Sequence, residues 1–598
     1  MEDRNDPTEI PGQVDLLPGS PDPVADADPS ARIARLARGT RPLGDGERQQ
    51  RQTAMSCSVL DPEEAGSGCT EVLHLSVFFD GTGNNRNEEM DKPVDRRALS
   101  NIAKLHSAYV REEPNIARPY IPGVGTPFSE IGDEGGVGGS AFGNGGGERV
   151  EYALQQLDEL IEKQAAKKIL IINVSVFGFS RGAAQARAFV RDLAVRCKPQ
   201  PDGTWRYGEI PLRVAFMGIF DTVCSVWNGP VSATFNAKDG HSDWAHDVKL
   251  PPIVEQCVHM TAAHELRPQF PLDSTRDDGR YPHNTVEIWY PGVHSDVGGG
   301  YDPKYQGRKN SIARFGLHEM YDMAKAAGVL LRNIPNLDVE DQDEFNKDDP
   351  ELRAAYNGYL QAVRLKQGRL EAVQAAHMEL LHRWLKVRIG RGDNLASMQQ
   401  LREREDVLKA ELRTLNRQKS RLKDPYNSYE SMSAEEMAEW NTTEDAIRAK
   451  YSELSEATKH RRGLLREADV LARKMASLRR KRDRGRKLSM SERTMLQAWE
   501  NTAPLPENVE LFFDGYGHDS TSHWFTGNLT KWRTIYFGDT KYKPENVTAY
   551  RKFKRPFRAV CWVGGGRASP VLGTDRTSVS GISASRGHAA ALSAAMLR

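Results

Sequence analysis

Nine residues in the first third of the chain decide its fold, and they read Val176-Phe177-Gly178-Phe179-Ser180-Arg181-Gly182-Ala183-Ala184. They contain the pattern G-x-S-x-G, which follows an apolar run at 169–177 and precedes an Ala-rich segment at 185–194. Small residues two positions either side of a serine allow it to occupy a strained turn between a strand and a helix. The pattern therefore predicts Ser180 as a nucleophile, and the alternative is a glycine-rich turn with a bystander serine.

The segments around this turn predict an α/β fold. Apolar runs at 72–79, 213–220 and 286–290 are typical of buried strands, and helices are expected at 98–110 and 148–164. Continuous apolar strands that alternate with helices favour a mostly parallel sheet covered on both faces. We therefore expect an α/β-hydrolase-like, mostly parallel sheet.

The composition changes after about residue 335, where the chain becomes highly charged and poor in glycine. Leucines recur every seven residues in this region, and Lys-Asp-Pro-Tyr-Asn at 423–427 interrupts the helical pattern. We expect a long charged helical insertion folded as an antiparallel hairpin. An apolar run at 509–513 then predicts a strand that returns to the sheet.

Five parts are expected along the chain. They are a disordered or loosely attached arm at 1–70, the catalytic core at 71–335, the helical hairpin at 336–504, a return to the catalytic body at 505–565, and a flexible tail at 566–598.

The charge balance gives no general attraction to nucleic acid, because 82 basic residues face 82 acidic ones. The six cysteines are scattered, so neither a metal site nor a disulfide framework is expected, and the predicted chemistry needs no cofactor. The N-terminus lacks the basic and apolar regions of a Sec-type signal peptide, so any export would need no cleaved leader.

A serine nucleophile needs a base, and the base needs an acid that orients it. In α/β-hydrolases the chain order is Ser, then Asp or Glu, then His, on loops after strands. Asp221 follows the strand at 213–220 and His294 follows the strand at 286–290, so we predict both as catalytic. Two alternatives stay open: Asp296 as the orienting acid and His518 as the base. Asp221 would otherwise be a helix cap or a turn residue.

The oxyanion of such a reaction needs two donors. The N–H of Arg181, which follows the nucleophile, is the first. The second is expected from the turn Asp80-Gly81-Thr82-Gly83-Asn84 after the strand at 72–79, where the backbone N–H of Gly81 or Thr82 would donate. An ordinary glycine turn is the alternative for this segment.

A basic run at 479–487 lies near the end of the insertion. Such a run attracts anionic membranes by about 1 kcal/mol for each basic residue near the surface. A solvated helix end is the more usual role of a charge run.

Four stretches of the sequence resemble a known family. They are Phe79-Asp80-Gly81-Thr82-Gly83-Asn84, Gly178-Phe179-Ser180-Arg181-Gly182-Ala183, Gly218-Ile219-Phe220-Asp221-Thr222-Val223 and Trp289-Tyr290-Pro291-Gly292-Val293-His294-Ser295-Asp296-Val297-Gly298-Gly299-Gly300-Tyr301. Over about residues 72–330 the chain is similar to the uncharacterised alpha/beta-hydrolase family that includes the first class of type VI secretion lipase effectors.

This resemblance implies a phospholipase A-type activity with a triad at Ser180, Asp221 and His294. It also implies a phospholipid membrane substrate, a secretion spike protein as carrier and a cognate immunity protein. The protein would be made in a bacterial cytoplasm and delivered into the periplasm of a target cell. Two alternative functions remain: a soluble carboxylesterase or thioesterase, and a non-enzymatic protein that uses its helical insertion for interaction.

Overall fold

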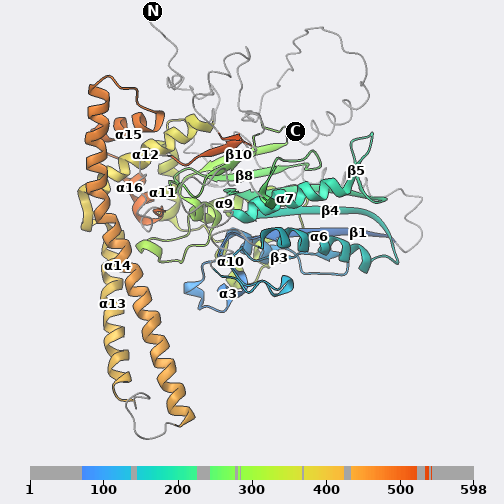
Figure 1. Ribbon diagram of the computed structural model, residues 1–598, viewed down its shortest axis with the longest axis horizontal. Coiled ribbons are helices and arrows are strands. Elements are labelled where there is room, and N and C mark those ends of the chain that lie inside the picture. Colours follow the sequence, from blue (N-terminus) through green and yellow to red (C-terminus); the bar gives the residue numbers. More distant parts are fainter. Residues whose placement is uncertain are drawn as a thin grey trace, which may run out of the picture.

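A nine-stranded sheet lies at the centre of the computed structural model (Figure 1). The structure describes residues 70–136, 145–224, 243–276, 281–282, 284–365, 370–422, 433–520, 532–537 and 540–541. The principal path of the sheet is β10-β8-β7-β4-β1-β2, and neighbours along this path are parallel. The strands are β1 (Thr70–Phe79), β2 (Ile116–Ala117), β3 (Tyr120–Ile121), β4 (Lys168–Phe179), β5 (Cys197–Pro199), β6 (Trp205–Tyr207), β7 (Ile210–Phe220), β8 (Cys257–Ala262) and β10 (Thr285–Tyr290).

The predicted α/β class is confirmed, and β1, β4, β7 and β10 include the four predicted strands. The antiparallel pairs in this sheet involve β6, which contacts β5 on one side and β7 on the other. Because β4 and β7 are neighbours and parallel, the residues that follow them leave the sheet at the same edge. Ser180 and Asp221 are these residues.

Helices cover both faces of the sheet. On one face α6 (Gly146–Lys163) and α7 (Arg181–Arg196) pack on side chains such as Val77 and Val176. On the other face α4 (Asn101–Ala108) and α9 (Ala313–Ala326) pack on Phe78 and Phe177. Successive side chains of a strand point to opposite faces, so each inner strand contributes to both cores.

The insertion is helical throughout its described part. Its helices are α10 (Val339–Glu344), α11 (Pro350–Ala362), α12 (Leu370–Arg391), α13 (Ala396–Lys419), α14 (Ala434–Asp483) and α15 (Met490–Glu500), and α16 (Glu507–Gly515) follows the insertion. Figure 1 shows α13 and α14 side by side, extending away from the sheet. Ion pairs such as Arg461 with Glu405 and Lys419 with Glu444 give these two helices an antiparallel register. The predicted break at 423–427 lies outside the described residues.

The predicted strand at 509–513 is wrong, because these residues belong to helix α16. The apolar side chains that α16 buries are Val509, Phe512 and Phe513. Their spacing of three and four residues is that of one helix face, which a five-residue window does not separate from a buried strand. The helix packs on α11 and extends the core of the body rather than its sheet.

A short second sheet brings the end of the described chain back to the body. Its strands are β9 (Leu272–Ser274), β11 (Ile535–Phe537) and β12 (Thr540–Lys541). β11 pairs in parallel with β9, and β12 pairs with β11. The arm predicted at 1–70, apart from Thr70, and the tail predicted at 566–598 lie outside the described residues.

Two observations bear on contact with a membrane. Among the described residues, no helix combines the length and the hydropathy needed to span a bilayer. Within the basic run at 479–487, Arg479 and Arg482 pair with Glu500 of α15, and Lys481 pairs with Glu492. These ion pairs neutralise part of the charge on which electrostatic attraction to a membrane would depend.

Candidate active site

Ser180 occupies the turn between β4 and α7 in a conformation that few residues adopt. Its φ of 58° and ψ of −125° lie outside the regions favoured by L-residues. A Cβ atom at Gly182 would lie 2.3 Å from the carbonyl oxygens of Phe79 and Asp80, and one at Gly178 would lie 2.5 Å from that of Gly182. The tight packing of α7 against β1 and β4 thus explains why both flanking residues are glycine.

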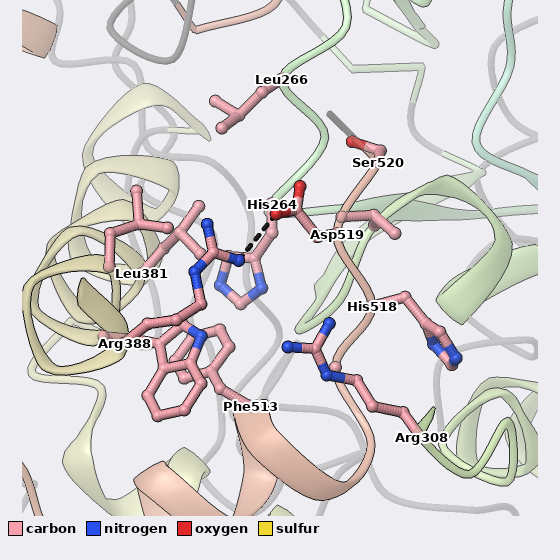
Figure 2. A pocket seen from close by; sticks show the side chains of 13 residues that line it. His264, Leu266, Arg308, Leu381, Arg388, Phe513, His518, Asp519 and Ser520 are labelled. Carbon is pink, nitrogen blue, oxygen red and sulfur yellow. Dashed lines mark hydrogen bonds and ion pairs between the residues drawn. The ribbon is translucent and has the colours of Figure 1, made fainter. Parts of the chain in front are cut away.

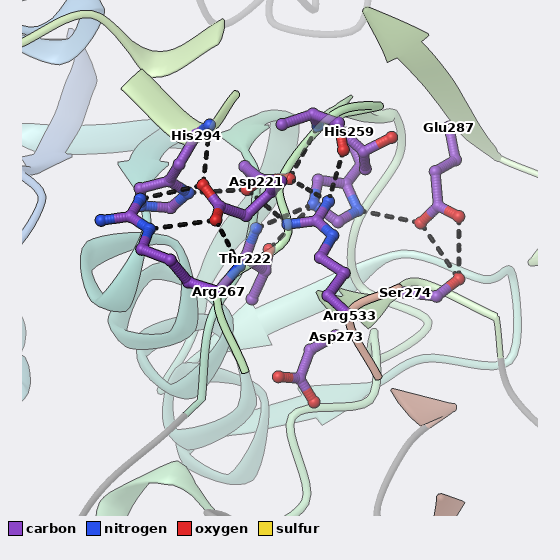
Figure 3. Close-up of polar contacts among 12 residues, drawn as sticks. Asp221, Thr222, His259, Arg267, Asp273, Ser274, Glu287, His294 and Arg533 are labelled. Carbon is purple, nitrogen blue, oxygen red and sulfur yellow. Dashed lines mark hydrogen bonds and ion pairs between the residues drawn. The ribbon is translucent and has the colours of Figure 1, made fainter. Parts of the chain in front are cut away.

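Asp221 and His294 form a short hydrogen bond. The imidazole Nδ1 of His294 lies 2.6 Å from Oδ2 of Asp221, and both side chains are buried (Figure 3). Because a carboxylate accepts, Nδ1–H is the donor, and Nε2 is left to accept a proton. Asp221 directly follows β7 with a positive φ of 40°, and His294 begins the short helix α8 (His294–Gly298).

The imidazole of His294 is held in its neutral form. Burial lowers its pKa, and this effect outweighs the Asp221 carboxylate, which raises the pKa. A neutral imidazole is the form that a general base requires.

The phenyl ring of Phe179 connects the turn at Ser180 with His294. Its ring centroid lies 4.6 Å from that of His294. A Cβ atom at Gly298 would lie 2.0 Å from this ring, so the loop after His294 approaches the turn closely because residue 298 is glycine. The ring of Phe270 lies on His294 from another direction, with a centroid distance of 4.9 Å. The imidazole is therefore fixed beside the residue that precedes Ser180.

The predicted oxyanion donors differ in their contacts. Arg181 is the first residue of the 16-residue helix α7, and the N-terminus of a helix favours a negative charge. The N–H of Gly81 donates to Oδ1 of Asp80 at 2.7 Å, so this donor is engaged. The hydroxyl of Thr82 is buried and has no hydrogen-bond partner. Thr82 is therefore the better candidate of the two for the second donor.

Asp80 anchors the turn that carries Thr82. Besides the N–H of Gly81, its carboxylate accepts from the hydroxyl of Ser100 at 2.7 Å and from that of Tyr120 at 2.6 Å. Burial raises the pKa of Asp80 to about 6, although these three hydrogen bonds lower it. The turn is thus fixed by a buried carboxylate at the end of β1.

The two alternative residues, Asp296 and His518, contact each other. Nδ1 of His518 lies 2.6 Å from Oδ1 of Asp296, and the backbone N–H of His518 donates to Oδ2 at 3.0 Å. Oδ2 also accepts from the N–H of Val293 at 3.0 Å. His518 follows a helix rather than the strand that the sequence indicated. The structure thus brings these residues together as a second pair and leaves His294 with Asp221.

A pocket lies beside this second pair (Figure 2). Its lining includes His518 and Phe513, together with Leu381 and Arg388 of α12. An ion pair of 2.7 Å joins Arg388 to Asp519. Ser180, Asp221 and His294 do not line this pocket, so it is separate from the candidate active site.

Arg533 is a partner of Asp221 that the sequence did not indicate. Its guanidinium donates to both carboxylate oxygens, at 2.7 Å to Oδ2 and 2.6 Å to Oδ1 (Figure 3). The charge of Arg533 and the hydrogen bonds from Arg533 and His294 hold the pKa of Asp221 well below its usual value, although burial raises it. No motif surrounds Arg533, and the contact joins residues 312 positions apart, so no local pattern could have revealed it.

A second buried network stands next to Asp221. Nε2 of His259 lies 3.1 Å from the hydroxyl of Thr222, and Nδ1 lies 2.9 Å from Oε2 of Glu287. This resembles a hydroxyl–imidazole–carboxylate relay, but all three side chains are inaccessible. The N–H of Thr222 also donates to Nε2 of His259, at 3.1 Å. The network therefore fixes the backbone after Asp221.

Among the residues that the structure describes, no set of three or more His, Cys, Asp or Glu side chains is arranged to hold a metal ion.

A mostly parallel sheet, a strained serine between a strand and a helix, and an Asp–His pair at the same edge define an α/β-hydrolase-like protein. Residues 74–195 and 201–323 match the family model described as T6SS, Phospholipase effector Tle1-like, catalytic domain. These two stretches are similar to the catalytic domain of that family of type VI secretion phospholipase effectors.

Two solved structures are similar to the chain. One is the crystal structure of an uncharacterized protein from Pseudomonas aeruginosa, with 24% identity, coverage of 83% of this chain and 82% of that one, and a TM-score of 0.61. It supports the fold. The other is the Tle1 effector bound to the VgrG spike from the Type 6 secretion system, with 20% identity, coverage of 52% and 84%, and a TM-score of 0.35. No curated protein matches the chain.

Proposed function

We propose that this chain is a serine hydrolase that cleaves a fatty-acyl ester of a phospholipid by a phospholipase A-type reaction. The observation that carries the proposal is the hydrogen-bonded pair of Asp221 and His294, fixed through Phe179 beside the strained turn of Ser180. The family match of residues 74–323 supports a phospholipid as the substrate.

In the proposed acylation, Nε2 of His294 takes the proton of the Ser180 hydroxyl as its oxygen bonds to the ester carbonyl carbon. The N–H of Arg181 and a donor of Thr82 stabilise the oxyanion. The tetrahedral intermediate then breaks its bond to the alkoxy oxygen, which takes the proton from His294 and leaves as lysophospholipid. Asp221 keeps Nδ1 protonated and stabilises the imidazolium.

Deacylation repeats these steps with water. His294 takes a proton from water as the water oxygen bonds to the acyl carbon. The bond to Ser180 then breaks, its oxygen recovers the proton from His294, and a fatty acid is released. The proposed chemistry uses side chains of this protein and water.

The first test compares Ser180→Ala with Ser175→Ala. Both remove a buried hydroxyl from the same segment, but Ser175 lies within β4, where its hydroxyl contacts Ser76 of β1. We expect Ser180→Ala to lose at least about 10³-fold in kcat and all labelling by a fluorophosphonate probe. Ser175→Ala should keep both. A folded Ser180→Ala variant with unchanged turnover would contradict the proposal.

Product analysis on defined phospholipid vesicles identifies the bond that is cleaved. We expect free fatty acid and lysophospholipid in equal amounts from the wild type and neither from Ser180→Ala. Hydrolysis of soluble short-chain esters alone would instead indicate a carboxylesterase or thioesterase.

We further propose that the protein is exported by a type VI secretion machine into the periplasm of a target cell, with a spike protein as carrier and an immunity protein in the producer. The family match supports this proposal. Expression in a bacterial host with an added export signal should be toxic, and both omission of the signal and Ser180→Ala should remove the toxicity. Equal toxicity from the cytoplasm would contradict the proposed site of action.

A further inference from the structure

We propose that Arg533 is a positioning residue of the active site, which orients Asp221 and sets the basicity of His294. This inference rests on the proposed serine mechanism. Arg533 lies beyond residues 74–323, so the site would be completed by a segment outside the matched catalytic domain.

The contacts of Arg533 fix the orientation of the Asp221 carboxylate. Two parallel hydrogen bonds from one guanidinium define the plane of the carboxylate, and the N–H of Ala262 adds a third donor at 2.8 Å. Arg533 is itself fixed, because it also donates to the carbonyl of Ala262 at 2.9 Å and lies over the ring of Trp289. In this arrangement Oδ2 of Asp221 faces Nδ1 of His294.

Both Asp221 and Arg533 are fully buried, and burial makes their pairing strong. A buried carboxylate without a counter-ion tends to take up a proton, and a protonated Asp221 would no longer stabilise an imidazolium. Arg533 therefore keeps the carboxylate ionised. It also opposes the effect of that negative charge on His294, so the imidazole stays neutral to lower pH.

The other charged groups around His294 are already paired. Glu265 and Arg267, from the loop after β8, contact each other at 2.9 Å, and Glu265 also accepts from the backbone N–H of His294 at 3.3 Å. Asp296, two residues after His294, is held by His518. Substitution of Arg533 leaves these pairs in place, so its effect on Asp221 and His294 can be measured separately.

The segment after α16 contacts this region at further points. His518 holds Asp296, and the hydroxyl of Ser520 donates to Oε1 of Glu265 at 2.8 Å. These residues position the loop of His294, while Arg533 positions the acid. The residues on both sides of 521–531 thus converge on the same pair.

The experiment compares Arg533→Gln with Arg213→Gln in the full chain. Arg213 is the matched control, since it also makes two contacts to one carboxylate, that of Glu255. It lies near the start of β7, at the opposite end of this strand from Asp221. For each variant the measurement is kcat/KM for a soluble ester between pH 5 and 9, with fluorophosphonate labelling and thermal unfolding alongside.

In Arg533→Gln we expect the acidic limb of the pH profile to move to higher pH by about one unit, and kcat/KM at pH 7 to fall about tenfold or more. Two outcomes of the substitution both move the acidic limb to higher pH. If Asp221 stays ionised, its unopposed charge raises the pKa of His294. If Asp221 takes up a proton instead, His294 loses the carboxylate that supports it as a base, and activity is lost. Arg213→Gln should change thermal stability without moving the limb. If Arg533 only stabilised the fold, Arg533→Gln would likewise lower thermal stability without moving the acidic limb.

If Arg533→Gln does not fold, the same measurements on Arg533→Lys test the inference. A lysine keeps the charge but cannot make both planar contacts, so a smaller shift in the same direction is expected. An acidic limb that stays in place in a folded Gln variant, or in the Lys variant when only that one folds, would overturn the inference. Failure of the wild type to react with the probe would instead overturn the proposed mechanism itself.

Discussion

The described part of the chain contains two buried Asp–His pairs with the same contact distance and different surroundings. Asp221–His294 and Asp296–His518 each join Nδ1 to a carboxylate oxygen at 2.6 Å. Nε2 of His518 is buried without a hydrogen-bond partner. His294, in contrast, lies beside the turn of a strained serine. A carboxylate-bound imidazole is therefore not sufficient to define a base, and we assign the base to the histidine that lies beside Ser180, the proposed nucleophile.

The two pairs also differ in how their carboxylates are compensated. The guanidinium of Arg533 donates to both carboxylate oxygens of Asp221. Asp296 instead accepts from the backbone N–H groups of Val293 and His518, in addition to the imidazole of His518. The first arrangement brings a full positive charge to the acid, and the second fixes a loop with neutral donors. We interpret Asp296–His518 as the contact that positions the loop of His294.

Substitution of the two histidines is expected to give the largest difference in kcat between the pairs. His294→Ala should lower kcat by about 10³-fold or more, because the serine loses its base. His518→Ala should lower it less than about tenfold, through looser positioning of the loop. Initial rates on a soluble ester, with circular dichroism to verify folding, test this comparison. A larger deficit in the His518 variant would reverse the assignment of the two pairs.

Substitution of the two aspartates is expected to give a smaller difference between the pairs. Asp221→Asn should lower kcat by about 10³- to 10⁴-fold, since an amide that donates to Nδ1 favours the wrong tautomer of His294. Asp296→Asn should cost stability instead, about 1 to 3 kcal/mol, as it weakens a buried charge-assisted hydrogen bond. Urea unfolding and turnover on the same samples separate the two effects. Equal losses of activity would mean that both pairs belong to one catalytic unit.

The smallest expected effect concerns His382, which is buried without a carboxylate and without a hydrogen-bond partner on either ring nitrogen. Burial lowers its pKa to about 3 in the folded protein, so the unfolded chain takes up this proton first as the pH falls below about 6.5. Stability is therefore lost with falling pH in this range.

His382→Leu removes that proton uptake. At pH 5.5 we expect a gain of about 1 kcal/mol relative to the wild type and a smaller change at pH 8. Urea titrations at both pH values measure the difference. A wild-type advantage that grows towards acidic pH would contradict the assignment of a neutral buried imidazole.

Local patterns were sufficient to predict which candidate residues follow the ends of strands. Ser180 follows the G-x-S-x-G strand, and Asp221 follows the neighbouring strand, so the parallel sheet alone brings both to one edge. The sequence placed a strand before both His294 and His518; the strand before His294 is present as β10, whereas the helix α16 precedes His518. The α/β class followed from the same alternation of strands and helices.

Other features depend on contacts that the sequence does not encode locally. The run at 509–513 fits both a strand and a helix in a short window, and only packing against α11 selects the helix. Arg533 lies in a segment without periodicity, and its partner is 312 residues earlier. The hydrogen bond from the N–H of Gly81 to Asp80 depends on the side-chain orientation of that buried carboxylate.

The ion pair between Asp221 and Arg533 joins two residues that are translated at very different times. A ribosome completes the strands around Asp221 long before it reaches the arginine, 312 residues later. The nascent chain thus carries this acid without its counter-ion while the whole insertion is being translated. A product terminated within the insertion would retain the serine turn and the histidine, but not the cation that completes their surroundings. The proposed active site is therefore complete only in chains that extend beyond the insertion to Arg533.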